Sequence, residues 1–122
     1  MNKQKFSLKK RIHSFRYAIE GLVAFFKEEH NARIHLVASC IVLSTGFFLK
    51  ISQMEWIAIL FAISIVFITE LINTSIERVA DYISPEFHPK IKLIKDLAAG
   101  AVLVAALFAI LVGSLVFIPH FW

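Results

Sequence analysis

The sequence predicts an all-α integral membrane protein in which three transmembrane helices follow an N-terminal amphipathic helix at the membrane interface. Of its 122 residues, 58% are hydrophobic and only 18% are charged, whereas soluble domains carry roughly 25% charged residues. Three apolar stretches approach or reach the about 17–25 residues that a helix needs to cross the hydrocarbon layer. Because so small a bundle cannot enclose a large dry site, we expect a homo-oligomer with a site in a surface groove or between subunits.

We expect a single membrane domain over residues 1–122 and no internal repeat. Its expected segments are an N-terminal region at 1–31, a first span at 32–50, a second span with a cytoplasmic extension at 54–83, and a third span at 90–118. Pro85 and Pro89 bracket the turn between the last two spans. Proline has no N–H to donate within a helix, so the second span is expected to end before this turn.

The N-terminal region has the pattern of an amphipathic helix. Apolar residues recur at intervals of three and four, and basic residues fill much of the other face; the apolar positions are Leu8, Ile12, Phe15, Ile19, Leu22, Val23 and Phe26. A helix lying in the membrane interface gives this pattern, and so does a helix packed on the outside of the bundle. No continuous apolar run ends in a small-residue cleavage site here, so we expect no cleaved signal peptide.

Lysine and arginine are unevenly distributed along the chain. They concentrate before the first span and between the second and third spans, and only Lys50 falls in the first connecting loop. The positive-inside rule then predicts a cytoplasmic N-terminus and a cytoplasmic segment from Arg78 to Lys95, with Lys50 and Trp122 outside. The net charge of +4 is explained by this topology and by attraction to anionic lipids, so we expect no nucleic acid partner.

The second span carries acidic side chains on one face. At about 100° per residue, Glu70, Glu77 and Asp81 fall within about 40° of one another, and Asn73 lies about 60° to one side. An ionisable group at membrane depth costs roughly 2.5 kcal/mol or more, so such groups usually face the bundle interior and serve a function. If this part of the helix lies in cytoplasmic solvent, the acidic residues at Asp81 and partly at Glu77 are explained. The position of Glu70 is poorly explained in this way, because its neighbours in the chain are apolar.

Further charged residues lie at the same predicted level of the membrane. Lys95 and Asp96 open the third span, and Glu28 and Glu29 end the N-terminal helix. A lysine suits a phosphate, although a lysine that reaches to the interface is an equally good explanation. Carboxylate oxygens suit a divalent cation that bridges substrate phosphates, so these acidic side chains together with Lys95 favour phosphoryl transfer. Cys40 is the only cysteine, and neither a disulfide, a zinc site nor a Gly-rich phosphate loop is expected.

Several motifs of the chain resemble those of a known family, the bacterial integral-membrane diacylglycerol kinases. The resemblance rests on Glu70-Leu-Ile-Asn73-Thr-Ser-Ile-Glu77-Arg-Val-Ala-Asp81, on Glu86-Phe-His88-Pro and on Lys95-Asp96-Leu-Ala-Ala-Gly100-Ala-Val. It extends to Ser14-Phe-Arg-Tyr17-Ala-Ile-Glu-Gly21-Leu and Glu29-His-Asn31-Ala-Arg33-Ile-His35, so nearly the whole chain aligns. The last two segments look most like the Gram-positive undecaprenol kinase branch.

The resemblance implies an ATP- and Mg²⁺-dependent lipid kinase of the bacterial cell membrane. It implies Glu70 as general base on the lipid hydroxyl, Glu29 and Glu77 as Mg²⁺ ligands, and Lys95 on the ATP phosphates. The residues that it places around the nucleotide are Lys10, Tyr17, Glu29, Glu77, Glu86, Phe87, His88, Lys95 and Asp96, and those that it places in supporting positions are Asn73, Arg33 and His35. It also implies a homotrimer whose sites are shared between neighbouring subunits near the cytoplasmic surface.

The lipid substrate is left open by two departures from the family pattern. His35 stands where the diacylglycerol-preferring branch has a carboxylate, and Lys10 or Arg11 stands where that branch has an arginine. Undecaprenol is therefore the leading substrate, with diacylglycerol as the alternative. A proton or cation pathway lined by Glu70 and Glu77 is a non-enzymatic alternative, but it leaves Lys95 unexplained. A scaffold subunit gives no reason for acids at membrane depth.

Overall fold

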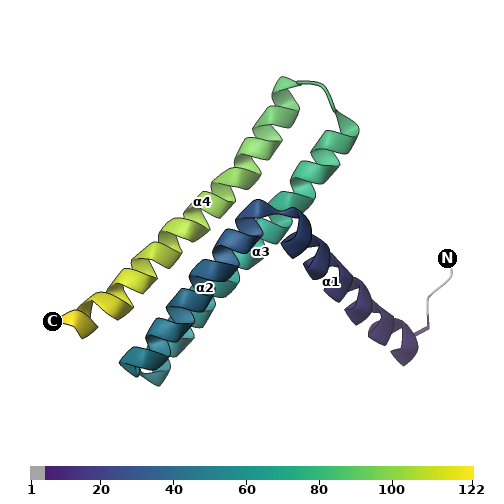
Figure 1. Ribbon diagram of the computed structural model, residues 1–122. Helices are drawn as coiled ribbons and strands as arrows, with labels where there is room; N and C mark the ends of the chain where they lie inside the picture. Colours follow the sequence, from purple (N-terminus) through teal and green to yellow (C-terminus); the bar gives the residue numbers. More distant parts are fainter. Residues whose placement is uncertain (1–4) are drawn as a thin grey trace.

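The computed structural model describes residues 5–122, and the described residues form helices without any strand. The elements in chain order are α1 (Leu8–Glu28), α2 (His30–Leu49), α3 (Gln53–Ile83), α4 (Pro89–Phe117) and the short 3₁₀ helix η1 (Ile118–Phe121) (Figure 1). By length and composition α2, α3 and α4 with η1 can each cross a membrane. The predicted all-helical architecture with three long apolar helices is therefore confirmed.

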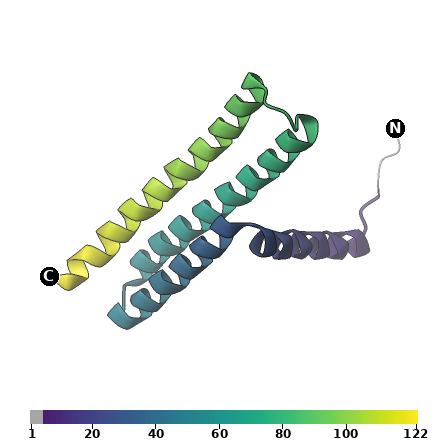
Figure 2. The ribbon, with the colours of Figure 1, turned by 45° about the horizontal axis from the view of Figure 1, so that its top comes forward.

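A hairpin of α3 and α4 forms the body of the molecule. The two helices run side by side in opposite directions, and α2 lies against the half of α3 that begins at Gln53. In both ribbon views α1 leaves the bundle at an angle from the start of α2 (Figure 2). We call the end of the bundle that holds the α2–α3 loop the Lys50 end, and the end that holds the α3–α4 turn the Pro85 end.

Local chemistry explains where each helix begins and ends. α3 starts with a capping box, in which Ser52 Oγ accepts from the Glu55 backbone N–H at 3.2 Å and Glu55 Oε1 accepts from the Ser52 N–H at 3.0 Å. α2 ends because Lys50 adopts a left-handed conformation with φ of 52°. α4 starts with Pro89 in its first turn, where its missing N–H has no helical partner to lose.

The Lys50 end contains a buried apolar cluster. Ile51, Ile59 and Val116 form a buried cluster there, which joins the α2–α3 loop to α3 and α4. A Cβ added to Gly46 would come within 2.7 Å of the Trp56 ring, so glycine is what allows α2 to approach α3 this closely.

The C-terminus is fastened to the same end of the bundle. His120 Nε2 lies 2.9 Å from Glu55 Oε2, so η1 is connected to the first turn of α3. Both side chains are only partly exposed, and the contact spans the two termini of the α3–α4 hairpin. The Lys50 end is therefore held by apolar packing and by a polar contact.

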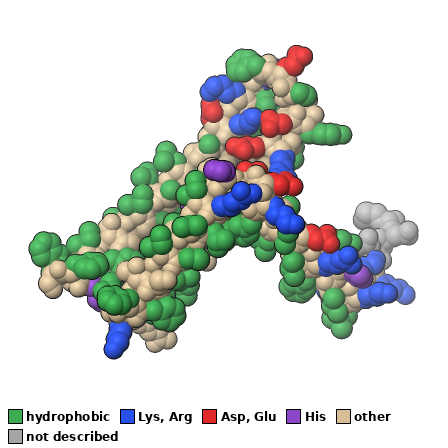
Figure 3. All heavy atoms as spheres, in the orientation of Figure 1, with side chains coloured by type: hydrophobic (Ala, Val, Ile, Leu, Met, Phe, Trp, Pro, Cys, Tyr) green, Lys and Arg blue, Asp and Glu red, His purple; other side chains and the backbone are tan. Residues whose placement is uncertain are grey.

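The outer surface of the three long helices is apolar. In Figure 3 most acidic and basic side chains gather near the Pro85 end, around the α1–α2 junction and along α1, and the rest of the bundle shows mainly hydrophobic side chains, with one basic side chain at the Lys50 end. The exposed large side chains of α4 include Leu97, Leu103, Val104, Leu107, Ile110, Leu111 and Leu115. Such a surface suits lipid or another apolar protein surface and would be unfavourable in water.

The close approach at Gly46 generates a first prediction. Alanine in place of a helical glycine ordinarily stabilises by about 1 kcal/mol, but at Gly46 the new methyl group meets Trp56 and Ile51. We expect Gly46→Ala to lower the free energy of unfolding by about 1 kcal/mol or more, measured by denaturant titration in detergent micelles. Gly21→Ala, where nothing lies near the added Cβ, is the matched control and should be neutral or stabilising. An equal gain from both variants would contradict the close packing.

Candidate active site

Glu70 lies buried in the middle of α3, with only 4% of its surface exposed. Its Oε1 is 3.0 Å from Nε2 of His35, which α2 supplies from the facing helix. The His35 ring in turn packs edge-on against Phe67, with ring centroids 6.4 Å apart. A buried carboxylate without a partner is strongly unfavourable, so the contact with His35 explains how Glu70 can occupy this apolar position.

Asn73 and Glu77 follow Glu70 along α3 toward the Pro85 end. Asn73 Nδ2 donates to Glu77 Oε1 over 3.4 Å. Asn73 Oδ1 is buried and has no hydrogen-bond partner among the described residues. A buried carbonyl oxygen left without a partner costs about 1–3 kcal/mol, so this oxygen is suited to a ligand group, either a donor or a hard cation.

The α1–α2 junction is fastened to α3 beside Glu77. Arg78 Nη2 donates to Glu28 Oε2 at 2.6 Å and to Glu29 Oε1 at 3.4 Å. Arg33 donates from α2 to backbone carbonyl groups at the end of α1, to Phe26 at 3.0 Å and to Lys27. These contacts bring the Glu29 carboxylate to the level of Glu77 on α3.

The carboxylates do not form a complete metal centre by themselves. Among the described residues, no group of three or more histidine, cysteine, aspartate or glutamate side chains is arranged to hold a metal ion. Glu29 and Glu77 could therefore supply only part of a coordination shell. Mg²⁺ commonly takes one or two carboxylates and completes its shell with phosphate oxygens and water, so this donor set fits a cation that arrives with a nucleotide.

A second group of charged side chains lines a pocket of about 320 Å³ at the Pro85 end. The lining residues are Asp81, Ser84, Pro85, Glu86, Phe87, His88, Ile91, Lys92, Lys95 and Asp96. Lys95 Nζ lies 2.7 Å from Asp81 Oδ1, across the two arms of the hairpin. Lys92 Nζ lies 2.5 Å from Asp96 Oδ2 on the same helix. The structure thus brings together five residues predicted for the nucleotide site, namely Glu86, Phe87, His88, Lys95 and Asp96.

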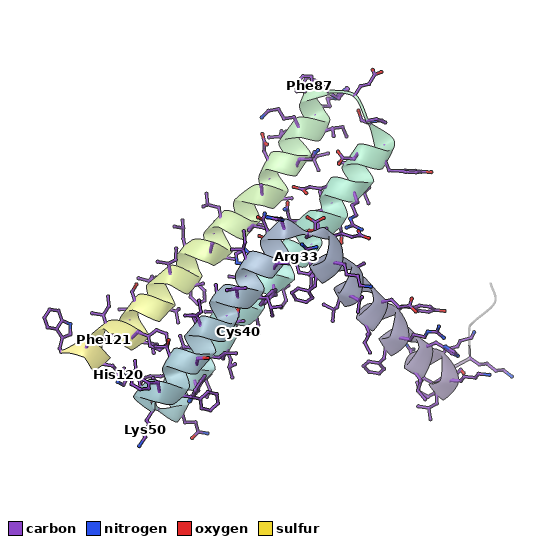
Figure 4. The ribbon with its side chains drawn as sticks, viewed as in Figure 1. Arg33, Cys40, Lys50, Phe87, His120 and Phe121 are labelled. Atoms are coloured by element: carbon purple, nitrogen blue, oxygen red, sulfur yellow. The ribbon has the colours of Figure 1, made fainter. Side chains whose placement is uncertain are left out.

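Lys10 and Tyr17 lie apart from this pocket. Both line a hollow of about 660 Å³ along α1, and α1 points away from the bundle (Figure 1). Figure 4 places Phe87 at the α3–α4 turn and Arg33 at the α1–α2 junction, at different levels of the molecule. Within one chain, the predicted residues therefore form three groups. The first consists of Glu70 and its neighbours on α3 together with the α1–α2 junction, the second lines the Pro85 pocket, and the third consists of Lys10 and Tyr17 on α1.

The structure also identifies contacts that the sequence did not indicate. Arg78 was not among the predicted site residues, yet it connects α3 to both acids of the junction. Its position directly after Glu77 in the acidic motif was the available signal. The direct pairing of His35 with Glu70 spans 35 residues of sequence, and no spacing rule could have indicated it.

Together these features define a helical membrane protein with a buried acid in its spans and phosphate-suited charges at one end. The chain matches the family model described as prokaryotic diacylglycerol kinase over residues 16–117. It therefore belongs to that family, which confirms the resemblance of its motifs, and it is a lipid kinase, a phosphotransferase.

Individual relatives differ in their named substrates. The chain is 41% identical over 106 residues to the undecaprenol kinase of Bacillus subtilis, covering 87% of this chain and 86% of that one. It is 36% identical over 107 residues to a diacylglycerol kinase of Synechocystis, covering 87% of this chain and 61% of the other. It is 31% identical over 107 residues to the diacylglycerol kinase of Haemophilus influenzae, covering 87% of this chain and 91% of that one.

The contacts of Arg78 generate a second prediction. We expect Arg78→Gln to loosen the α1–α2 junction, because Glu28 and Glu29 lose their shared partner. Trypsin should then cleave after Lys27 several times faster in protein held in lipid nanodiscs, as measured by mass spectrometry. Arg16→Gln removes an ion pair between neighbouring turns of α1, away from the junction, and should leave that cleavage rate unchanged. Equal rates for the two variants would reject the role of Arg78 at the junction.

Proposed function

We propose that the protein transfers the γ-phosphoryl group of ATP to the hydroxyl of undecaprenol, in the presence of Mg²⁺, at the cytoplasmic surface of a bacterial cell membrane. The observation that carries the proposal is the buried Glu70 carboxylate, fixed by His35 at 3.0 Å within the apolar α2–α3 interface. The printed name of the Bacillus subtilis relative favours undecaprenol. The names of the Synechocystis and Haemophilus influenzae relatives favour diacylglycerol, which would yield phosphatidic acid.

In this proposal Glu70 is the general base. The lipid hydroxyl oxygen attacks the γ-phosphorus, the bond from that phosphorus to the β,γ-bridging oxygen breaks, and ADP leaves. The hydroxyl proton passes to a Glu70 carboxylate oxygen. A base within the apolar part of α3 can meet a lipid whose chain stays in the membrane, and a positioned base ordinarily contributes about 100-fold to 10,000-fold to the rate.

The Pro85 pocket is the proposed nucleotide site. Lys95 would contact the ATP phosphates as a point charge, exchanging its contact with Asp81 for one with phosphate. Glu86, Phe87, His88 and Asp96 line the same pocket. The adenine would then lie toward the α3–α4 turn and the phosphates toward Glu70.

We assign Glu29 and Glu77 to the Mg²⁺ ion, which supplies charge neutralisation of the transferring phosphoryl group when it is bound. The unpaired Oδ1 of Asn73 beside Glu77 adds a third oxygen that suits a hard cation. Arg78 holds Glu29 at this level of α3. Arg33 supports the assignment by tying α2 to the end of α1.

A homotrimer is the proposed assembly, because one chain leaves the site incomplete. Lys10 and Tyr17 lie on α1 away from the Pro85 pocket, so their contribution to a nucleotide site would come from a neighbouring subunit. The apolar surface of the long helices is available for such contacts. With the basic α1 lying in the interface and the N-terminus in the cytoplasm, both parts of the site would face cytoplasmic ATP.

The third prediction tests the reaction and its substrate. Purified protein in detergent micelles with labelled ATP should phosphorylate undecaprenol at least several times faster than diacylglycerol at matched surface concentration. Product formation, measured by thin-layer chromatography, should require added Mg²⁺. Faster turnover of diacylglycerol would reverse the order of substrates, and transfer to neither lipid would reject the proposed function.

The fourth prediction tests the base. Glu70→Gln keeps the shape of the side chain but removes the proton acceptor, so turnover should fall by about 100-fold to 10,000-fold. ATP binding, measured by isothermal titration, should change little. Glu20→Gln alters an exposed carboxylate on α1 and should keep wild-type turnover. If Glu70 serves packing alone, Glu70→Gln should retain more than about a tenth of wild-type turnover, since neutralising a buried charge is often harmless.

A further inference from the structure

Glu70 has one polar partner among the described residues, and that partner can change its charge. The hydrogen bond joins His35 Nε2 to Glu70 Oε1 over 3.0 Å. The Glu70 side chain is 5% exposed, whereas the His35 side chain is 26% exposed. The imidazole is therefore the more accessible of the two groups.

From this geometry we propose that His35 is a positioning residue that controls Glu70 through its own protonation state. The proposal rests on the proposed function, in which Glu70 is the base. Neutral His35 donates its Nε2–H to Oε1, which fixes the carboxylate and leaves Oε2 to accept the proton of the lipid hydroxyl. Protonated His35 makes an imidazolium–carboxylate ion pair, in which Glu70 is a weaker base, so phosphoryl transfer slows.

Packing holds the imidazole in the orientation that this role requires. Phe67 lies edge-on to the His35 ring, and Phe26 lies edge-on to Phe67 with ring centroids 5.8 Å apart. The aromatic row runs from α1 through α3 to α2. A ring backed in this way keeps Nε2 directed at Glu70, which a flexible exposed histidine would not.

The other charged side chains near the α1–α2 junction have no described contact with His35. On its own helix, Arg33 donates to backbone carbonyl groups of α1. On α3, Glu77 accepts from Asn73, and Arg78 pairs with Glu28 and Glu29 from the junction. Lys27 of α1 is exposed, and its backbone carbonyl accepts from Arg33. None of these side chains has a described contact with Glu70.

Toward α4, His35 is the one titratable side chain among the described residues that line the neighbouring groove. A groove of about 540 Å³ has His35 on its wall, and the other lining residues are apolar or small: Ala38, Val42, Val66, Ala106, Ala109, Ile110, Gly113, Ser114, Phe117 and Ile118. His35 is therefore the group placed to pass a change in pH to Glu70. Imidazole changes charge between about pH 5 and 8, which is within the range of cellular conditions.

The test compares pH profiles of turnover for wild type and His35→Gln. Glutamine keeps an N–H donor near Glu70 but does not titrate. We expect wild-type kcat to fall with one-proton dependence as the pH decreases from about 8 to about 5, the range in which an imidazole group can change its charge. His35→Gln should have a lower maximal kcat, an unchanged KM for ATP, and no such fall.

The matched control is His120→Gln, which removes the other histidine–glutamate contact of the bundle at the Lys50 end. It should keep the wild-type pH profile, because the partner of His120 is Glu55 in the first turn of α3, far along that helix from Glu70. A profile of His35→Gln that falls like that of wild type would overturn the proposal. So would a profile of His120→Gln that is flat.

A second measurement does not depend on any variant folding well. Nitrogen-15 NMR of histidine-labelled wild-type protein should show His35 changing from the Nε2–H neutral form to imidazolium over the pH range in which kcat falls. Neutral His35 throughout that fall would overturn the proposal. Inactivity of the wild type toward both lipids, or full activity of Glu70→Gln, would instead reject the proposed function on which it rests.

Discussion

The structure depends on the placement of one carboxylate in an apolar environment. Glu70 is buried in the middle of a helix that can cross a membrane, and an unpaired charge there would be strongly unfavourable. The partner comes from α2, so α2 must cross α3 at the level of His35. That level in turn sets the position of the α1–α2 junction, at the start of α2, and brings Glu29 beside Arg78. The site and the arrangement of the first three helices are consequences of the same contact.

The sequence predicted well what depends on local pattern. Three apolar stretches predicted three long helices, because the length and composition of each are properties of a continuous segment. The acidic face of α3 followed from helical periodicity alone. The pairing of His35 with Glu70 could not be predicted from the residues in this way, since it depends on how two helices rotate against each other. The direction of α1 also lay beyond the sequence, because one extended residue, Glu29, sets it.

The candidate site is spread over parts of the chain that a single subunit does not bring together. The Pro85 pocket lies at the tip of the hairpin, and the hollow that contains Lys10 and Tyr17 lies on α1. In the proposed homotrimer, neighbouring subunits would complete the enclosure of the site. Apolar side chains form a buried cluster at the Lys50 end. The opposite end of the bundle, where ATP is proposed to bind, has fewer buried side chains.

The uninterrupted course of α3 from Gln53 to Ile83 has a consequence for how the gene can vary. One inserted or deleted residue between Glu70 and Asp81 would rotate all later side chains by about 100° and shift them by about 1.5 Å. Glu77 would then leave the face it shares with Glu70, and Asp81 would turn away from Lys95. A substitution in this segment alters the contacts of one side chain, whereas a change in its length alters those of all later side chains together. The segment should accordingly accept changes of residue far more readily than changes of length.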